Sequence, residues 1–384
     1  MFTDADRQHM ARAIELAAQG LCTTMPNPRV GCVIVRDGLV VGEGWHRQTG
    51  QPHAEVLALA EAGELARGAT AYVTLEPCAH HGRTPPCADR LVEAGVAKVI
   101  AAIEDPNRLV NGKGLARLRE AGITVRCGLL ADEATALNEG FIARMTRGWP
   151  WVRLKAASSL DGFIALPNGE SQWITGEQAR ADGHAWRARA CAILTGIGTV
   201  KADNPSLTVR HVPTARQPVR VLVDARLEVD EHAAIFGPGE VWVAHALPDD
   251  WPDGGKRQRL LDRGVRLLSL PDESRRRVSL PALLQEMGKA GFNELHVEAG
   301  AGLNAALMTA GLVDELLLYL APSLLGAGLQ ALKMPPVPAL DQRIRLAWRD
   351  VSPVGNDLRL RARVLNADAA GEPSEGLHPV PAAS

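Results

Sequence analysis

The chain has 384 residues, of which 46% are hydrophobic and 22% are charged, and its formal net charge is -2. This length exceeds that of one typical compact core, so two domains are expected. Because the cations are scattered, the sequence offers no basic stripe for nucleic-acid phosphates, and we expect a free small molecule as the substrate.

The N-terminus is charged and lacks the apolar core of a signal segment. No later stretch reaches the roughly 20 apolar residues that a membrane span requires. We therefore expect a protein of the cytoplasm without a membrane partner, where cysteines stay reduced and are free to bind a metal.

Strands and helices are predicted to alternate through the first part of the chain. A helix is expected over residues 4–19, and the hairpin signal Arg36–Gly38 joins two strands at 30–35 and 39–41. Later strands are expected at residues 70–75, 98–103 and 123–126, and later helices from His53, from Cys87 and over 115–121. This alternation predicts a layered α/β domain with site residues at helix starts beside strand ends.

A domain boundary is expected near residue 148, because Pro150 resists helix continuation and a strand over 151–156 follows at once. Further strands, alternating with helices, are expected at residues 192–195, 219–223, 241–244, 265–268 and 295–298. The expected division is therefore two α/β domains, 1–147 and 148–366. Residues 367–384 are rich in Ala, Pro, Gly and Ser and are expected to form a disordered tail.

The first domain carries residues that suit a catalytic zinc ion. His53, Cys78 and Cys87 supply one imidazole and two thiolates, and three protein ligands leave one position for water. Glu55 follows His53 by two residues and is expected to carry a proton from water to a leaving amine. This His-x-Glu and Pro-Cys pattern is typical of zinc-dependent nucleobase deaminases. The alternatives are a structural zinc site and a pair of unrelated core thiols.

The second domain contains two glycine turns that follow apolar strands. Residues 298–305 match the G-x-G-x-x-A form of a dinucleotide loop, and residues 195–199 form the second turn. Two such turns favour a nucleotide cofactor, although glycine turns also serve only to pack a helix on a strand. No acidic residue lies about 20 positions further on, so a Rossmann domain that binds NAD is not supported.

Four segments closely resemble the bifunctional riboflavin-biosynthesis deaminase–reductase family. They are residues 26–35 (PNPRVGCVIV), 52–55 (PHAE), 72–87 (YVTLEPCAHHGRTPPC) and 170–175 (ESQWIT). The eight residues between Cys78 and Cys87, where deaminases usually have two, are that family's own pattern. The resemblance implies a cytidine-deaminase-like three-layer α/β/α fold in the first domain and a dihydrofolate-reductase-like α/β fold in the second.

The resemblance also implies zinc and NADPH as cofactors, and it assigns site residues by position. NADPH is expected to contact Ala157, Trp173, Thr199, Asp203, Gly300, Ala301, Gly302, Leu303, Asn304, Ala305 and Ala306. The substrate of the reductase is expected to contact Lys155, Ser171, Arg187, Leu207, Arg210 and Glu298. The two arginines suit its phosphate, although surface salt bridging is their alternative role. The deaminase substrate is expected near Asn27, His46, His80, Arg83 and Asn107.

Two successive reactions follow from the resemblance. The first is hydrolytic deamination of 2,5-diamino-6-(5-phosphoribosylamino)pyrimidin-4(3H)-one to 5-amino-6-(5-phosphoribosylamino)uracil. The second is NADPH-dependent reduction of the ribosyl group to ribityl, by a protein expected to be a homo-oligomer. The alternatives are a nucleic-acid base deaminase, against which the lack of a basic face counts, and a non-catalytic protein with a structural zinc site.

Overall fold

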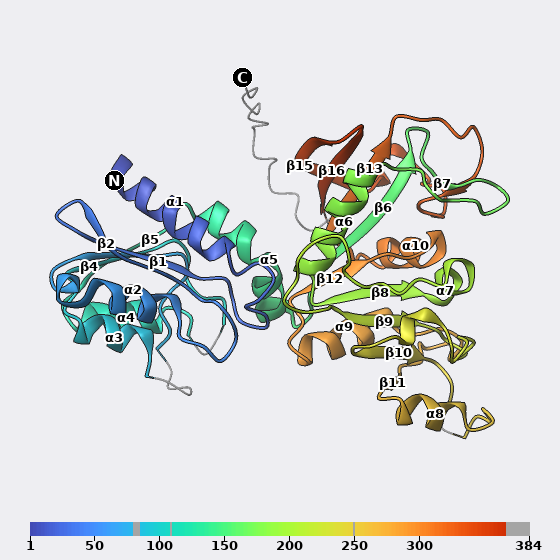
Figure 1. Ribbon diagram of the computed structural model, residues 1–384, viewed down its shortest axis with the longest axis horizontal. Coiled ribbons are helices and arrows are strands. Elements are labelled where there is room, and N and C mark those ends of the chain that lie inside the picture. Colours follow the sequence, from blue (N-terminus) through green and yellow to red (C-terminus); the bar gives the residue numbers. More distant parts are fainter. Residues whose placement is uncertain (80–84, 108–109, 249, 366–384) are drawn as a thin grey trace.

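The computed structural model describes residues 1–79, 85–107, 110–248 and 250–365, which form two α/β domains side by side (Figure 1). The expected tail over 367–384 lies outside these residues. Within the described ranges, no helix is both long and apolar enough to cross a membrane.

The first domain is built on a sheet of order β2-β1-β3-β4-β5. Strands β1 and β2 are antiparallel, as are β1 and β3, whereas β3, β4 and β5 are parallel. The elements are α1 (Asp4–Ala18), β1 (Gly31–Arg36), β2 (Leu39–Trp45), α2 (Ala54–Ala62), the 3-10 helix η1 (Gly63–Ala66), β3 (Thr70–Val73), α3 (Cys87–Glu93), β4 (Lys98–Ala101), α4 (Lys113–Glu120), β5 (Thr124–Cys127) and α5 (Ala131–Arg147).

Successive residues of a strand point to opposite faces of a sheet. The strands here carry apolar residues on both faces, and helices cover both of them. Val33 and Val35 of β1 face the core that α1 and α5 complete. Cys32 and Ile34 face the core that α2, α3 and α4 complete. The predicted three-layer α/β/α arrangement is therefore confirmed.

Two local signals place the first elements where the sequence predicts them. Thr3 and Asp6 form a reciprocal capping box, which satisfies backbone N–H groups at the start of α1. Asp37 and Gly38 have φ values of 51° and 81°, the conformation of a tight hairpin turn between β1 and β2.

The second domain is built on a larger sheet of order β11-β10-β9-β8-β12-β6-β13-β16-β15. The strands from β11 to β13 in this order are parallel to their neighbours, and β16 and β15 close one edge in antiparallel pairing. The elements are β6 (Trp151–Ser159), β7 (Phe163–Ala165), α6 (Glu177–Arg189), β8 (Ala192–Gly196), α7 (Ile197–Asp203), β9 (Val219–Val223), η2 (Ala234–Phe236), β10 (Val241–His245), α8 (Lys256–Asp262), β11 (Arg266–Ser269), α9 (Leu280–Lys289), β12 (Glu294–Val297), α10 (Ala301–Thr309), β13 (Glu315–Ala321), β14 (Leu329–Gln330), η3 (Leu340–Gln342), β15 (Arg345–Val354) and β16 (Asp357–Leu365).

Helices again cover two faces, as β8 illustrates. Leu194 packs in the core that α9 and α10 share, whereas Ile193 packs in the core that α7 and α8 share. Five of the six strands that the sequence predicts in this domain are found within one residue of their predicted ends, whereas the strand predicted over 151–156 extends three residues further, to Ser159. The predicted α/β class of the second domain is confirmed.

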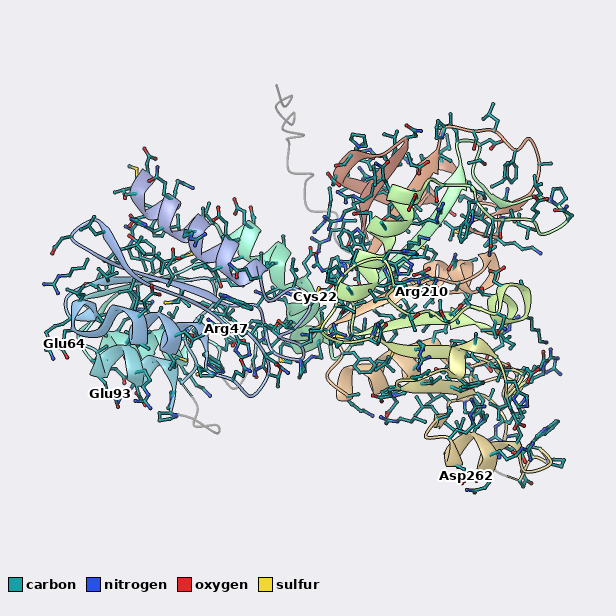
Figure 2. The ribbon with its side chains drawn as sticks, in the orientation of Figure 1. Cys22, Arg47, Glu64, Glu93, Arg210 and Asp262 are labelled. Carbon is teal, nitrogen blue, oxygen red and sulfur yellow. The ribbon has the colours of Figure 1, made fainter. Side chains whose placement is uncertain are left out.

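The two domains meet where α5 packs against the start of β12 (Figure 1). A Cβ atom added at Gly140 of α5 would lie only 2.6 Å from the Asn293 carbonyl oxygen, so this position requires glycine. Arg29 forms an ion pair with Glu294 across the same junction at 2.7 Å, and both side chains are buried. Arg216 of the second domain donates to the carbonyl of Cys22, which lies at the junction in Figure 2.

Candidate functional site

The three candidate metal ligands come from loops and helix starts at one edge of the first sheet. His53 is the N-cap residue of α2, and Cys87 is the first residue of α3. Cys78 lies in the loop that follows β3, the strand next to β4 in the parallel part of the sheet. The carboxyl edge of parallel strands brings these loops together, as the sequence predicts.

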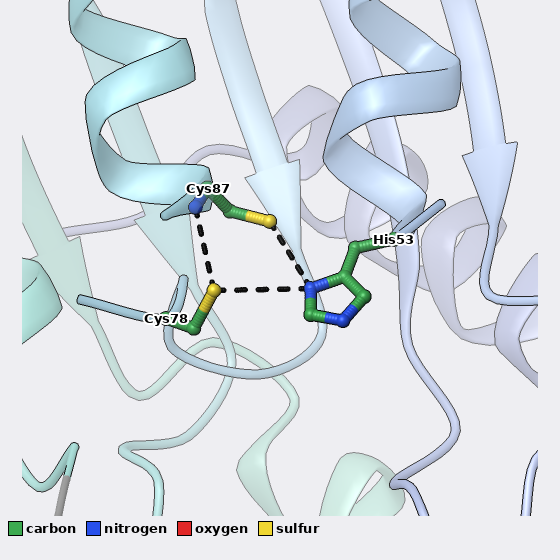
Figure 3. A group of neighbouring side chains, drawn as sticks. All are labelled: His53, Cys78 and Cys87. Atoms are coloured by element: carbon green, nitrogen blue, oxygen red, sulfur yellow. Dashed lines mark hydrogen bonds between the residues drawn. The ribbon is translucent and has the colours of Figure 1, made fainter. Parts of the chain in front are cut away.

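Figure 3 shows the imidazole of His53 facing both sulfur atoms. The His53 Nδ1 atom lies 3.2 Å from Cys87 Sγ and 3.8 Å from Cys78 Sγ. The three ligand atoms all lie within 4.8 Å of one another. Bonds of about 2.0 Å from nitrogen and 2.3 Å from sulfur to one tetrahedral zinc ion fit this spacing. One imidazole and two thiols therefore suit zinc in kind and in position.

The electrostatics of Cys78 favour metal binding, whereas the hydrogen bond to Cys78 raises the pKa of Cys87 above its ordinary value. A hydrogen bond from Cys87, aided by His53, lowers the pKa of Cys78 to about 4. The backbone N–H of Cys87 also donates to Cys78 Sγ at 3.3 Å. Because thiolates rather than thiols bind metals, Cys78 is prepared to receive a cation at neutral pH, and Cys87 would lose its proton as the metal binds.

Glu55 is placed to handle protons beside these ligands. It lies in the first turn of α2 and is 3% exposed. Burial raises the pKa of its carboxyl group above the ordinary value. A carboxyl group whose pKa lies closer to neutrality can both accept and donate a proton, which a deaminase requires.

A cavity of about 420 Å³ adjoins His53, Cys78 and Glu55. Three residues that the sequence assigns to the substrate, Asn27, His46 and Asn107, line it together with them. Asn27 Nδ2 lies 3.0 Å from His46 Nε2, and the Pro52 carbonyl lies 3.1 Å from His46 Nδ1. The predicted residues His80 and Arg83 lie outside the described residues.

Glu76 is a buried site residue to which the sequence analysis gave no role. Its carboxylate accepts hydrogen bonds from four backbone N–H groups, those of Asp105, Gly112, Gly114 and Leu115, at 2.8 to 3.2 Å. It thereby ties the loop that leads to Cys78 to the segment that carries Asn107 and to the start of α4. The only feature of the sequence that could have indicated this role is the position of Glu76, two residues before the ligand Cys78.

The two glycine turns of the second domain lie next to each other. They follow β8 and β12, which are neighbouring parallel strands. A Cβ atom at Gly300 would lie 3.6 Å from Thr199 Oγ1, and Cβ atoms at Gly198 and Gly302 would meet open space. Exposed backbone at the carboxyl edge of adjacent parallel strands suits a nucleotide phosphate group.

Several predicted substrate contacts gather beside these turns. Arg187 donates to both carboxylate oxygens of Glu298, at 2.5 and 2.8 Å, and to the Thr208 carbonyl at 3.0 Å. Burial alone would favour the neutral acid, but Arg187 outweighs it and holds the pKa of Glu298 well below its usual range. Arg187 and Glu298 therefore hold charges of opposite sign together at this site. Burial disfavours the charge of the nearby Lys155 and lowers its pKa.

The remaining predicted contacts differ in how available their side chains are. Trp173 is 68% exposed, and the Arg180 guanidinium lies 4.4 Å from its ring centroid. Asn304 and Ala305 are buried, and the Asn304 amide donates to the carbonyls of Ala299 and Ala331. Asp203, Arg210, Gly302 and Ala306 are exposed; Ala157, Ser171, Thr199, Gly300, Ala301 and Leu303 are half-buried; Leu207 is buried.

Comparisons with known proteins assign each of the two domains to a known enzyme family. Residues 3–103 match the family described as cytidine and deoxycytidylate deaminase zinc-binding region, and residues 150–360 match the RibD C-terminal domain. The riboflavin biosynthesis protein RibD of Escherichia coli strain K12 is 47% identical over 371 residues, covering 92% of this chain and 98% of that protein.

Solved structures of similar proteins also cover both domains of this chain. A RibD structure from Acinetobacter baumannii is 46% identical with a TM-score of 0.86, covering 94% of this chain and 99% of that one. A Thermotoga maritima structure described as a diaminohydroxyphosphoribosylaminopyrimidine deaminase and 5-amino-6-(5-phosphoribosylamino)uracil reductase is 32% identical, with a TM-score of 0.83 and coverage of 94% and 99%.

These matches span both domains and most of the chain. The comparisons support zinc in the first domain and NADPH in the second, and they do not favour a nucleic-acid deaminase or a non-catalytic zinc protein. The chain belongs to the RibD family of riboflavin-biosynthesis enzymes, in which a zinc-dependent deaminase and an NADPH-dependent reductase share one polypeptide.

Proposed function

We propose that this enzyme acts on the phosphorylated pyrimidines that the Thermotoga relative's description names. The first reaction replaces the amino group of 2,5-diamino-6-(5-phosphoribosylamino)pyrimidin-4(3H)-one by oxygen from water and releases ammonia. The second adds a hydride from NADPH and a proton from solvent to the ribosyl group of 5-amino-6-(5-phosphoribosylamino)uracil, with the hydride at C1', and yields the ribityl compound. The observation that carries the proposal is that His53, Cys78 and Cys87 lie together as candidate metal ligands, while His53, Cys78 and Glu55 line one cavity.

In the deaminase site, His53, Cys78 and Cys87 would hold the zinc ion. Zinc supplies Lewis acidity toward water near neutral pH. Glu55 would take a proton from the attacking water and deliver it to the departing amine. Asn27, His46 and Asn107 would hold the pyrimidine in the cavity that they line, and His80 and Arg83 are proposed contacts on sequence grounds.

In the reductase site, the turns at 195–199 and 300–306 would bind NADPH, with Ala157, Trp173 and Asp203 as further contacts. The nicotinamide supplies the hydride when bound, and the protein orients it toward the substrate. Lys155, Arg187 and Glu298 would hold the substrate, together with Ser171, Leu207 and Arg210. The ion pair of Arg187 with Glu298 supports this role, since it fixes a guanidinium of α6 to a carboxylate that directly follows β12.

We also propose that the catalytic halves correspond to residues 1–147 and 148–366. The end of α5 at Arg147 and the start of β6 at Trp151 support this division. A homo-oligomer in the cytoplasm stays a prediction from the sequence.

Mass spectrometry of the products tests this function. The purified enzyme, given the diaminopyrimidinone and NADPH, should produce a compound that has exchanged an NH group for oxygen and gained two hydrogen atoms. Chelation of zinc should stop the exchange yet leave the reduction of added uracil compound intact. Formation of the reduced diamino compound without any exchange would contradict the proposed order.

A further inference from the structure

One wall of the deaminase cavity belongs to the other domain. Lys289, Ala290 and Gly291, at the end of α9, line the cavity that also contains His53 and Glu55. Gly291 has φ of +87°, and a Cβ atom there would lie 3.1 Å from Pro26 Cβ. The backbone of the reductase domain therefore closely approaches the turn over residues 24–27 of the deaminase domain, here called the Pro26 turn.

Asn293 links the two domains behind this wall. Its side-chain N–H donates to the Pro26 carbonyl at 3.0 Å, and its side-chain oxygen accepts from Arg144 Nε at 2.6 Å. Arg144 donates to the same Pro26 carbonyl at 3.0 Å. The backbone of Asn293, in contrast, bonds within the second domain, to Cys191 and Trp151. The described hydrogen bonds of this side chain thus all cross the junction.

The Pro26 turn leads directly to the cavity. Asn27 is the next residue, and its amide lies 3.0 Å from His46 Nε2, while both side chains line the cavity. Asn293 is only 3% exposed, so its two hydrogen bonds form away from water and hold a defined geometry. A shift of the Pro26 carbonyl would be passed to Asn27 and then to His46.

We propose that Asn293, a residue of the reductase domain, positions Asn27 and His46 for the deamination reaction, so that the second domain completes the first domain's substrate site. This inference rests on the proposed function. A side chain that sets the position of substrate contacts affects the rate strongly, because a displacement of about 1 Å can cost on the order of 100-fold.

Steady-state kinetics of Asn293→Ala and Asn293→Asp in the full-length enzyme test this inference. The aspartate variant has nearly the same volume and keeps the acceptor for Arg144, but it loses the donor to Pro26. We expect kcat/KM for deamination to fall at least about tenfold in both variants, mainly through a higher KM. Zinc content and reduction of the supplied uracil compound should stay at wild-type levels, since no zinc ligand or reductase contact is changed.

The control is Glu139→Gln, which weakens a second contact across the same junction, between Glu139 of α5 and Arg349 of β15, away from the cavity. This variant should deaminate at the wild-type rate. Equal losses in Glu139→Gln and the Asn293 variants would overturn the inference, because the contact would then only stabilise the junction. Wild-type deamination in both Asn293 variants would overturn it as well. A wild-type enzyme that releases no ammonia would instead overturn the proposed function.

Discussion

Glu55 lies in the first turn of α2, and Glu298 directly follows β12. Their surroundings shift the pKa values of the two carboxyl groups in opposite directions. Burial raises the pKa of Glu55 and outweighs the opposing effect of His53. Glu298 is also buried, yet the bidentate contact with Arg187 keeps its pKa well below the usual range. One group is thus suited to exchange protons, whereas the other is suited to remain charged and orient a substrate.

The pairing of Arg187 with Glu298 leads to a first prediction. Arg187→Lys keeps the positive charge but loses the planar pair of N–H donors that meets both carboxylate oxygens. We expect KM of the reductase for the uracil compound to rise about tenfold, the equivalent of ~1.4 kcal/mol. Steady-state assays of NADPH oxidation measure this change, with ammonia release as the control. An unchanged reductase KM would exclude the predicted role of Arg187.

A second prediction concerns Glu76, whose carboxylate accepts four backbone N–H groups. Glu76→Gln replaces one acceptor oxygen by a donor that faces those groups, so about 2 kcal/mol of stability should be lost. The amide protons of Gly112, Gly114 and Leu115 should exchange with solvent faster, and deamination should slow while reduction does not. Glu104→Gln, an exposed neighbour, is the matched control. Equal exchange rates in both variants would refute this role.

At this scale, the sequence could predict residues whose chemistry is visible in a short motif. His53, Glu55, Cys78 and Cys87 lie in two such motifs, and the structure brings them together. The role of Glu76 could not be predicted, since it depends on N–H groups some 30 to 40 positions away. Asn293 could not be found either, because its partners Pro26 and Arg144 belong to another domain.

At the scale of helices and strands, apolar periodicity located the parallel strands of the large sheet except β13, which the sequence analysis did not predict. β8, β9 and β10 are buried on both faces, and their sequences are short apolar runs. Helix α5 was not predicted, because it begins without a side-chain cap after Leu130 and deviates from helical geometry at Asn138. Helix α6 was also not predicted, since its buried positions include Gly183 and His184 beside few large apolar residues.

A buried ionic row joins three strands of the large sheet and leads to a third prediction. Arg153 of β6 bonds to Glu294 of β12 at 3.1 Å and to Glu315 of β13 at 2.9 Å. Burial disfavours the charged form of Glu315, but Arg153 and Arg361 outweigh it and lower the pKa to about 2. An unfolded glutamate has the ordinary value of 4.5.

The sign of the pH dependence follows from these two values. Above about pH 4.5 the carboxylate is charged in both states, and the ion pairs contribute in full. As the pH falls toward 2, the unfolded state binds a proton first, and about 3 kcal/mol of stability is lost. The unfolding free energy of Glu315→Gln should therefore approach that of the wild type as the pH falls over this range. Denaturant titrations at several pH values measure it, and a constant difference would contradict the account.

At the scale of the whole molecule, two chemically different sites share one chain and one junction. The deaminase cavity opens beside the end of α9, and β12 runs from the junction at Glu294 to the reductase site at Glu298. The order of the two reactions places ammonia release before hydride transfer. Because the two sites are separate, a substitution of Glu55 should abolish deamination and leave the reduction of the uracil compound unchanged.

The most direct measurement follows ammonia release and NADPH oxidation together, in one cuvette, for wild type and Glu55→Ala given the diaminopyrimidinone. Wild type should release ammonia and then oxidise NADPH. Glu55→Ala should lose about 100- to 10,000-fold in deamination rate, since it lacks the proton carrier, and should oxidise NADPH only when the uracil compound is supplied. Wild-type ammonia release by the variant, or no NADPH oxidation by either protein with the uracil compound, would contradict this account of two ordered sites.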